Sequence, residues 1–182
     1  MGNPLRDRRT PKELAASRQV IDFAIKITDL EQLTAIVEGD LETLDPDKLP
    51  SGWRETQATG QLRFGFADAQ EALPQLEGEV SATIDVVCQR CLEPLSLPLA
   101  VELKLLFAAD EAVDGGDDFE VWELDEESIR PLDVVEEALI MALPLAAMHD
   151  NEKCRSPDEA EAGESVTIRP FAALKSQMEK EN

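Results

Sequence analysis

The fold is decided by residues 79–107, which read EVSATIDVVCQRCLEPLSLPLAVELKLLF. Apolar and polar residues alternate in both halves of this stretch. The apolar sets are Val80, Ala82, Ile84, Val86 and Cys88, and Leu95, Leu97, Leu99, Val101, Leu103, Leu105 and Phe107. A period of two over such lengths predicts two strands that each bury one face. Because the break over 89–94 is short, we expect antiparallel neighbours. Pro98 removes one backbone donor, which predicts an edge or a bulge on its side of the second strand.

Weaker patterns on either side of this hairpin predict three more strands. Strand-forming residues fill 20–27, apolar residues alternate with others over 62–66, and 119–122 forms a further short apolar stretch. Together with the helices described next, these strands predict an α+β fold. Its sheet is expected to be antiparallel, with about five strands, or to be a partly open barrel, with two flanking helices.

Two helices are predicted from apolar residues at helical spacing. The first is capped by Thr28 or Asp29 and ends at Gly39. The second begins at Pro131, where a missing N–H is harmless, and stops at Pro144.

Composition divides the chain into three parts. Residues 1–17 are expected to form a flexible basic arm, and 18–154 a single α+β domain. An acidic loop over 108–130, with ten acidic side chains around a Gly-Gly pair, interrupts this domain. Residues 155–182 are predicted to be an acidic tail that carries a terminal Pro-Phe motif.

Charge is the strongest global signal in the sequence. The 182 residues hold 17 basic and 39 acidic side chains, a net charge of −22. A surface this acidic repels a nucleic-acid backbone, which proteins grip with Lys and Arg. Six basic and three acidic residues fall within 1–26, which leaves −25 on the rest. This arm, with Arg6, Arg8 and Arg9, is therefore the segment predicted to contact RNA. The alternative is an ordinary disordered terminus.

The sequence gives no sign of membrane insertion or catalysis. No stretch approaches the roughly 20 apolar residues that cross a bilayer, and the N-terminus does not resemble a signal peptide. We expect a cytoplasmic protein without a membrane partner. There is one histidine, and there is neither a nucleophile motif nor a phosphate-binding loop. The prediction is a non-enzyme with no catalytic residue and no small-molecule substrate.

Four residues form a candidate zinc site. Cys88 and Cys91 form a C-x-x-C pair at the tip of the predicted hairpin, and His149 and Cys154 follow the second predicted helix. Three cysteines and one histidine are a ligand set of closed structural zinc sites. The spacing of His149 and Cys154 is looser than usual, however, and they lie about sixty residues away.

Three alternatives to zinc stay open for these cysteines. A redox pair normally starts a helix, where the dipole lowers the thiol pKa, but this pair lies between strands. A disulfide is disfavoured in a reducing cytosol. Cys88 is otherwise a small core residue, with Cys91 in the turn. Arg90, between the two cysteines, is a candidate contact for a phosphate or a partner carboxylate. The favoured alternative is an internal salt bridge with a neighbour such as Glu93.

Three segments of the chain resemble a known family. The first is Cys88-Gln89-Arg90-Cys91-Leu92-Glu93-Pro94-Leu95, which follows a Val-rich strand. The second, over 137–154, is Glu-x-Leu-Ile-x-Ala-Leu-Pro followed by Met-His-Asp-x-Glu-x-Cys, and the third is Pro-Phe-Ala-x-Leu over 170–174. Their order and separations resemble the YceD family, whose hallmark is C-x-R-C-L. The resemblance spans nearly the whole chain.

This resemblance implies a non-enzymatic factor needed for synthesis, processing or stability of large-subunit (23S) ribosomal RNA. Some relatives carry a cysteine-richer block after the Leu-Pro. This sequence keeps only His149 and Cys154 there, so a metal site would have to borrow Cys88 and Cys91.

The expected partner is a ribosomal or ribosome-assembly protein with a basic surface, which the acidic exterior would attract. Phe171 and Leu174 are predicted to anchor such a partner, unless they pack on their own domain. Ribosomal RNA would then be contacted indirectly or through the arm. The alternatives are a direct RNA-binding protein that uses the arm, and a zinc-stabilised adaptor or regulator.

Overall fold

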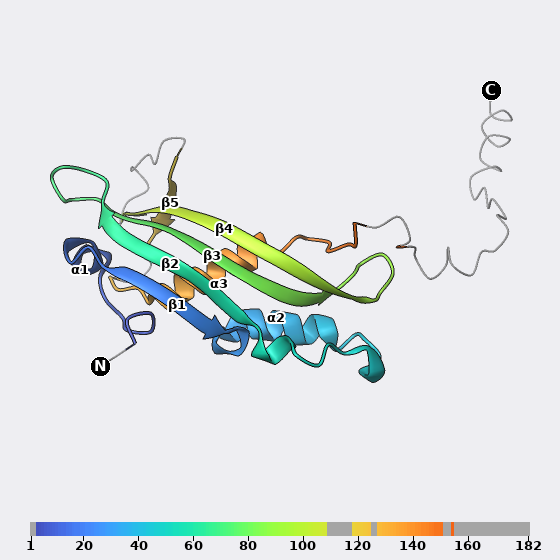
Figure 1. Cartoon of the computed structure of the whole chain (residues 1–182). Helices are drawn as coiled ribbons and strands as arrows, with labels where there is room; N and C mark the ends of the chain where they lie inside the picture. The colour runs from blue at the N-terminus through green and yellow to red at the C-terminus, as the bar shows by residue number, and fades with distance from the viewer. Residues whose placement is uncertain (1–2, 109–117, 125–126, 151–153, 155–182) are drawn as a thin grey trace, which may run out of the picture.

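One curved five-stranded sheet forms the body of the protein (Figure 1). The computed structural model describes residues 3–108, 118–124, 127–150 and 154. The sheet has the order β1-β2-β3-β4-β5. Its strands are β1 (Val20–Lys26), β2 (Gln57–Phe66), β3 (Pro74–Val87), β4 (Pro94–Ala108) and β5 (Glu120–Glu123). The predicted α+β class is confirmed, and the sheet is open rather than a closed barrel.

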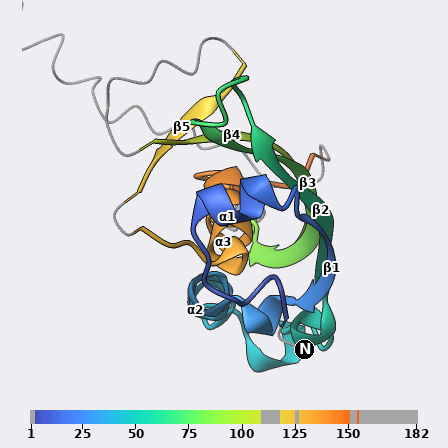
Figure 2. The same cartoon turned by 90° about the vertical axis from the view of Figure 1, so that its left-hand side faces the viewer.

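The helices gather on the concave side of the sheet, as Figure 2 shows. They are α1 (Pro11–Ala16), α2 (Glu31–Leu41) and α3 (Pro131–Ala142). Short 3₁₀ turns cover Ile27–Asp29, Pro46–Lys48 and Trp53–Glu55. One hydrophobic core fills the space between the helices and the sheet. No helix in the described residues is long and apolar enough to cross a bilayer.

The predicted hairpin is confirmed as β3 and β4, which pair antiparallel over nearly their full lengths. Val80 and Ile84 are buried while Ser81 and Thr83 are exposed, as the period of two predicts. Pro98 lies in a part of β4 that, among the described residues, has only β3 beside it. This placement agrees with the edge predicted from its missing N–H.

The short fifth strand is also confirmed, but it pairs with β4 in parallel, with Leu105 opposite Glu120. The sheet is therefore mixed and not wholly antiparallel as predicted. A parallel neighbour requires a longer connection than a hairpin, and residues 109–119 connect the two strands. Residues 109–117 and 125–126 of the predicted acidic loop lie outside the described residues.

The first predicted helix is α2, but its ends differ from the prediction. Leu30, not Thr28 or Asp29, is the N-cap residue, and its side chain makes no capping bond. The helix continues past Gly39 because Val37 and Leu41 bury their side chains in the core. A glycine in a helix costs only about 1 kcal/mol, less than the burial of one such side chain. The second helix, α3, begins at Pro131 and ends before Pro144, as predicted.

The segment predicted as a flexible arm is instead packed against the body. Thr10 and Glu13 form a capping box that starts α1. Leu5 and Leu14 are each 1% exposed. The Leu5 carbonyl accepts a hydrogen bond from the backbone N–H of Leu132, at 2.8 Å. Pro11 and Ala15 are buried as well, so this basic, proline-containing stretch contributes several side chains to the interior.

The N-terminus of α2 is capped by a side chain from α3. Glu136 is 7% exposed, and its Oε1 accepts hydrogen bonds from the backbone N–H groups of Gln32 (2.6 Å) and Leu33 (3.1 Å). A helix N-terminus leaves such N–H groups without partners and favours negative charge. Glu136 therefore joins two helices that lie about a hundred residues apart in sequence.

Replacing this carboxylate tests its contribution to stability. Glu136→Ala is expected to lower the free energy of unfolding by about 2–3 kcal/mol, since one buried and one partly buried N–H group lose a charged acceptor. Urea unfolding followed by circular dichroism measures the change. The matched control is Glu137→Ala, an exposed neighbour on the same helix, which should shift stability by less than about 0.5 kcal/mol. Equal unfolding free energies for the two variants would contradict this assignment.

Candidate metal centre

The structure brings the four predicted metal ligands together at one end of the β3–β4 hairpin. Cys88 directly follows β3, Cys91 lies in the turn, and His149 and Cys154 follow α3. Their ligand atoms, three Sγ atoms and one imidazole nitrogen, all lie within 4.8 Å of one another. The two halves of the set are thus adjacent in space despite the long chain between them.

The hairpin turn places its two thiols on the same side. The Cys88 carbonyl accepts a hydrogen bond from the Leu92 N–H, and the Cys88 N–H donates to the Glu93 carbonyl, both at 2.9 Å. Leu92 has φ 58°, in the left-handed region that L-residues seldom adopt. This conformation reverses the chain tightly after Cys91, so that both thiols lie at the tip of the hairpin.

Backbone and side-chain contacts hold the segment after α3 against this turn. The Ala147 carbonyl accepts a hydrogen bond from the Gln89 N–H at 2.8 Å. Arg90 reaches across the turn, with Nη1 3.5 Å from the Cys154 carbonyl oxygen and Nη2 3.5 Å from the Met148 sulfur. In Figure 1 this segment runs from α3 toward the β3–β4 turn.

The distances between ligand atoms fit a tetrahedral zinc site. Cys88 Sγ lies 3.5 Å from Cys154 Sγ, and Cys91 Sγ lies 3.4 Å from His149 Nδ1. With Zn–S bonds of about 2.3 Å and Zn–N bonds of about 2.0–2.1 Å, the edges of a tetrahedron are about 3.8 and 3.6 Å. These two distances are close to tetrahedral edges, and the donor set is one that closed Cys₃His sites use, so the cluster could hold a zinc ion.

The pKa values of the two most buried thiols are shifted in opposite directions. Burial raises the pKa of Cys88, but the backbone N–H groups of Cys91, Arg90 and His149, with the Cys154 thiol, lower it by more, to about 5. Burial raises the pKa of Cys154, and the neighbouring Cys88 and Cys91 raise it further, to about 11. Of the two thiols, Cys88 therefore ionises more readily and Cys154 less readily than an ordinary cysteine.

The alternatives to a metal site find less support in this geometry. The three cysteines are free, and 3.5 Å between Cys88 and Cys154 is far longer than an S–S bond of about 2.05 Å. The C-x-x-C pair follows a strand and does not start a helix, which disfavours a thioredoxin-like role. A plain core role explains the complete burial of Cys88, but it does not explain why His149 and Cys91 converge on it.

Arg90 and Arg6, two of the other predicted contacts, have partners within the chain that the sequence did not indicate. Arg90 does not pair with Glu93, whose carboxylate instead binds Lys48 at 2.6 Å. Arg6 forms an ion pair with Asp29 at 2.7 Å. The remaining predicted partner contacts fall into two groups: Arg8 and Arg9 lie in the packed N-terminal segment, and Phe171 and Leu174 lie outside the described residues.

Sequence reasoning missed one residue that supports the site. Asp40, near the end of α2, accepts a hydrogen bond from the Val87 N–H at 2.6 Å. This bond fixes the last residue of β3, directly before Cys88. No local sequence pattern indicates it, since an aspartate on the polar side of a helix is common and its partner lies 47 positions away.

Metal analysis tests the ligand set. The purified protein is expected to carry one zinc ion per chain, and Cys91→Ser should weaken zinc affinity by at least about 100-fold, because a closed site loses one of four ligands. Competition with a chromogenic chelator measures the affinity. Gln89→Ser changes the same turn without touching a ligand and should leave the affinity unchanged. If both variants bind zinc like the unmodified protein, the assignment of Cys91 as a zinc ligand is wrong.

The two thiol pKa values predict proton release on metal binding. Zinc binds thiolates, so at pH 7 Cys154, with its pKa of about 11, must lose a proton when it becomes a ligand. Protons compete with the metal, and affinity should therefore fall as the pH falls. Calorimetric titration in buffers of different ionisation enthalpy measures the released protons. Zinc binding to the Cys154→Ser variant should release one proton fewer. A binding enthalpy independent of buffer would contradict the prediction.

Comparison with known proteins agrees with the sequence motifs. Residues 76–180 match the family model described as "Large ribosomal RNA subunit accumulation protein YceD". A curated protein from Haemophilus influenzae with that same description is 35% identical over 97 residues, which cover 52% of this chain and 56% of that protein. The chain thus aligns with only about half the length of this relative. No solved structure matches. Because the matched residues make up more than half of the chain and include both halves of the Cys₃His cluster, the chain belongs to the YceD family.

Proposed function

We propose that this protein is a non-enzymatic factor for the synthesis, processing or stability of large-subunit (23S) ribosomal RNA. It acts in the cytoplasm, on a ribosomal or ribosome-assembly protein with a basic surface. The family description supports the link to large-subunit RNA. Phe171 and Leu174, which fall within the matched region, are proposed as additional partner contacts.

The distribution of charge favours a protein partner over RNA. The chain has a net charge of −22, and many of its cations are already paired with carboxylates. Ion pairs among the described residues include Arg6–Asp29, Lys26–Glu55, Lys48–Glu93, Arg54–Glu38, Lys104–Glu102 and Arg130–Asp133. An exterior with this excess of carboxylates attracts basic proteins and repels phosphates.

The arrangement of the cluster supports a structural role for its metal, and with it the non-enzymatic assignment. A catalytic zinc keeps one coordination position open for water or substrate, whereas four protein ligands close the site. The cluster joins the end of β3 to the segment after α3. A zinc-stabilised adaptor is therefore the second candidate description, and it is compatible with the first.

Direct RNA binding through the N-terminal segment is the competing proposal. It would use Arg6, Arg8 and Arg9, with Arg90 as a further contact. Arg6 is engaged with Asp29, and Arg90 reaches toward the Cys154 carbonyl. Deleting the segment would also remove the buried Leu5 and Leu14, so substitutions test this proposal better than truncation.

Deletion of the gene is expected to lower the ratio of large- to small-subunit ribosomal RNA, and a plasmid copy should restore it. Quantified total RNA gives this ratio. The triple variant Arg6→Gln, Arg8→Gln and Arg9→Gln should restore it as well as the unmodified copy does, because the proposed partner is a basic protein.

Two results would contradict the proposed function or its mode of action. An unchanged RNA ratio after deletion would end the link to large-subunit RNA. Failure of the triple variant, together with tight and salt-sensitive binding of the purified protein to naked large-subunit RNA, would replace the protein partner with RNA.

A further inference from the structure

The outer edge of β4 is open along most of its length. β4 pairs with β3 from Pro94 to Leu106 but with β5 only from Leu105 to Ala108. Within the described part of the chain, Pro94–Lys104 therefore has a strand neighbour on one side only. Such an edge presents unpaired N–H and C=O groups that can pair with another extended chain.

Alternate residues of β4 point their backbone N–H and C=O groups away from β3, toward the open edge. The Ala108 carbonyl accepts a hydrogen bond from the Leu124 N–H, on the side of β5. Because backbone direction alternates along a strand, Ser96, Pro98, Ala100 and Glu102 share this outward orientation. Three of these four residues offer both a donor and an acceptor, and Pro98 offers an acceptor alone.

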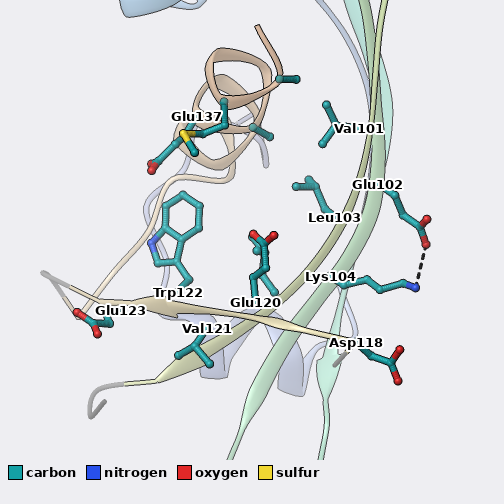
Figure 3. A pocket seen from close by; sticks show the side chains of 14 residues that line it. Val101, Glu102, Leu103, Lys104, Asp118, Glu120, Val121, Trp122, Glu123 and Glu137 are labelled. Carbon is teal, nitrogen blue, oxygen red and sulfur yellow. Dashed lines mark ion pairs between the residues drawn. The ribbon is translucent and has the colours of Figure 1, made fainter. Parts of the chain in front are cut away.

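An open cavity of about 860 Å³ adjoins this edge, between β4, β5 and α3 (Figure 3). Its apolar lining includes Val101, Leu103, Trp122 and Met141. Met141 is 79% exposed although it is a large apolar side chain. Figure 3 shows Val101 and Leu103 pointing from β4 toward the side of the cavity where Trp122 lies. Apolar side chains of an added strand would find contacts here.

Carboxylates surround the same edge. Five acidic residues line the cavity, namely Glu102, Asp118, Glu120, Glu123 and Glu137, against one cation, Lys104, which is paired with Glu102 at 3.2 Å. In Figure 3 Glu137 and Glu120 lie on the α3 side of β4, and Glu102 and Asp118 lie on the opposite side. Both faces of an added strand would therefore meet negative charge.

We propose that the β4 edge binds an extended, basic segment of a partner protein as an additional strand. The segment spans about eight residues, the length between Ser96 and the start of β5. It places apolar side chains in the cavity and Lys or Arg side chains on the surrounding carboxylates. The same carboxylates repel RNA and a second copy of this chain. This inference rests on the proposed action through a basic protein partner and names the surface that it uses.

The first test uses a synthetic nonapeptide of alternating lysine and valine with blocked ends, added to the full-length protein. Amide hydrogen exchange, followed by NMR, is expected to slow at least about tenfold at Ala100 and Glu102 when these donors become paired. The Leu99 amide points toward β3, so its exchange rate should not change. A block isomer of the same composition, with all lysines before all valines, should bind at least about tenfold more weakly.

Matched variants separate strand pairing from general charge attraction. Ala100→Pro removes an outward donor at a position like that of Pro98 and should weaken peptide binding at least about tenfold. Ala100→Thr keeps the donor and should stay within about twofold. Glu137→Lys should weaken binding more than Glu42→Lys, which makes the same charge change at the C-cap of α2. Met141→Ser should weaken it more than Ile36→Ser, an exposed position on α2. Fluorescence anisotropy of labelled peptide gives the affinities.

Each outcome decides the proposal. Binding that slows the Ala100 amide and is lost in Ala100→Pro supports strand addition. Equal binding of both peptides, or unchanged exchange at Ala100 and Glu102, overturns it even if Ala100→Pro fails to fold, because those measurements use the unmodified protein. Tighter binding of an RNA oligonucleotide than of the alternating peptide also overturns it.

The variants also separate this inference from the proposed function in cells. If the deletion lowers large-subunit RNA and a stably folded Ala100→Pro copy restores it fully, the strand-addition inference fails and the function stands. If the deletion has no effect on the RNA, the function itself fails. Loss of rescue by Ala100→Pro, with rescue by Ala100→Thr, supports both.

Discussion

The long antiparallel pairing of β3 with β4 is the constraint on which the rest of the structure depends. It runs from Gln75 opposite Leu106 to Val87 opposite Pro94. Its concave face supplies much of the core, and its turn places Cys88 and Cys91 at one point. Its other end provides the residues that pair with β5. A shift of register by one residue would turn the apolar face to solvent and move Cys88 out of the cluster.

Local periodicity predicted the parts of the fold that depend on neighbouring residues. The hairpin, the short fifth strand and the start of α3 at Pro131 follow from alternation, β-propensity and proline chemistry. The parts that failed depend on distant contacts. Burial of Leu5 against α3 ordered a segment that composition alone marks as flexible, and burial of Leu41 extended α2 past Gly39. The direction of β5 was not readable from the four residues that form it.

The candidate site was likewise predictable from the sequence only in part. Residue types identified Cys88, Cys91, His149 and Cys154 as a zinc ligand set, but only the fold shows that they are adjacent. Asp40 and Glu136 gave no sequence signal, because each looks like one more carboxylate in an acidic chain. Both accept hydrogen bonds from backbone N–H groups of other elements. Some of the abundant negative charge therefore stabilises the fold, in addition to shaping the exterior.

The open edge of β4 also has a consequence for how the protein behaves at high concentration. Exposed edge strands with alternating apolar residues are sites of intermolecular aggregation, and proteins protect them with charge and proline. Here Pro98, Glu102 and the high net charge provide that protection. Near the isoelectric point of about 4.2 the net charge vanishes and like-charge repulsion with it. A storage buffer near this pH therefore favours edge-to-edge association of this chain through β4.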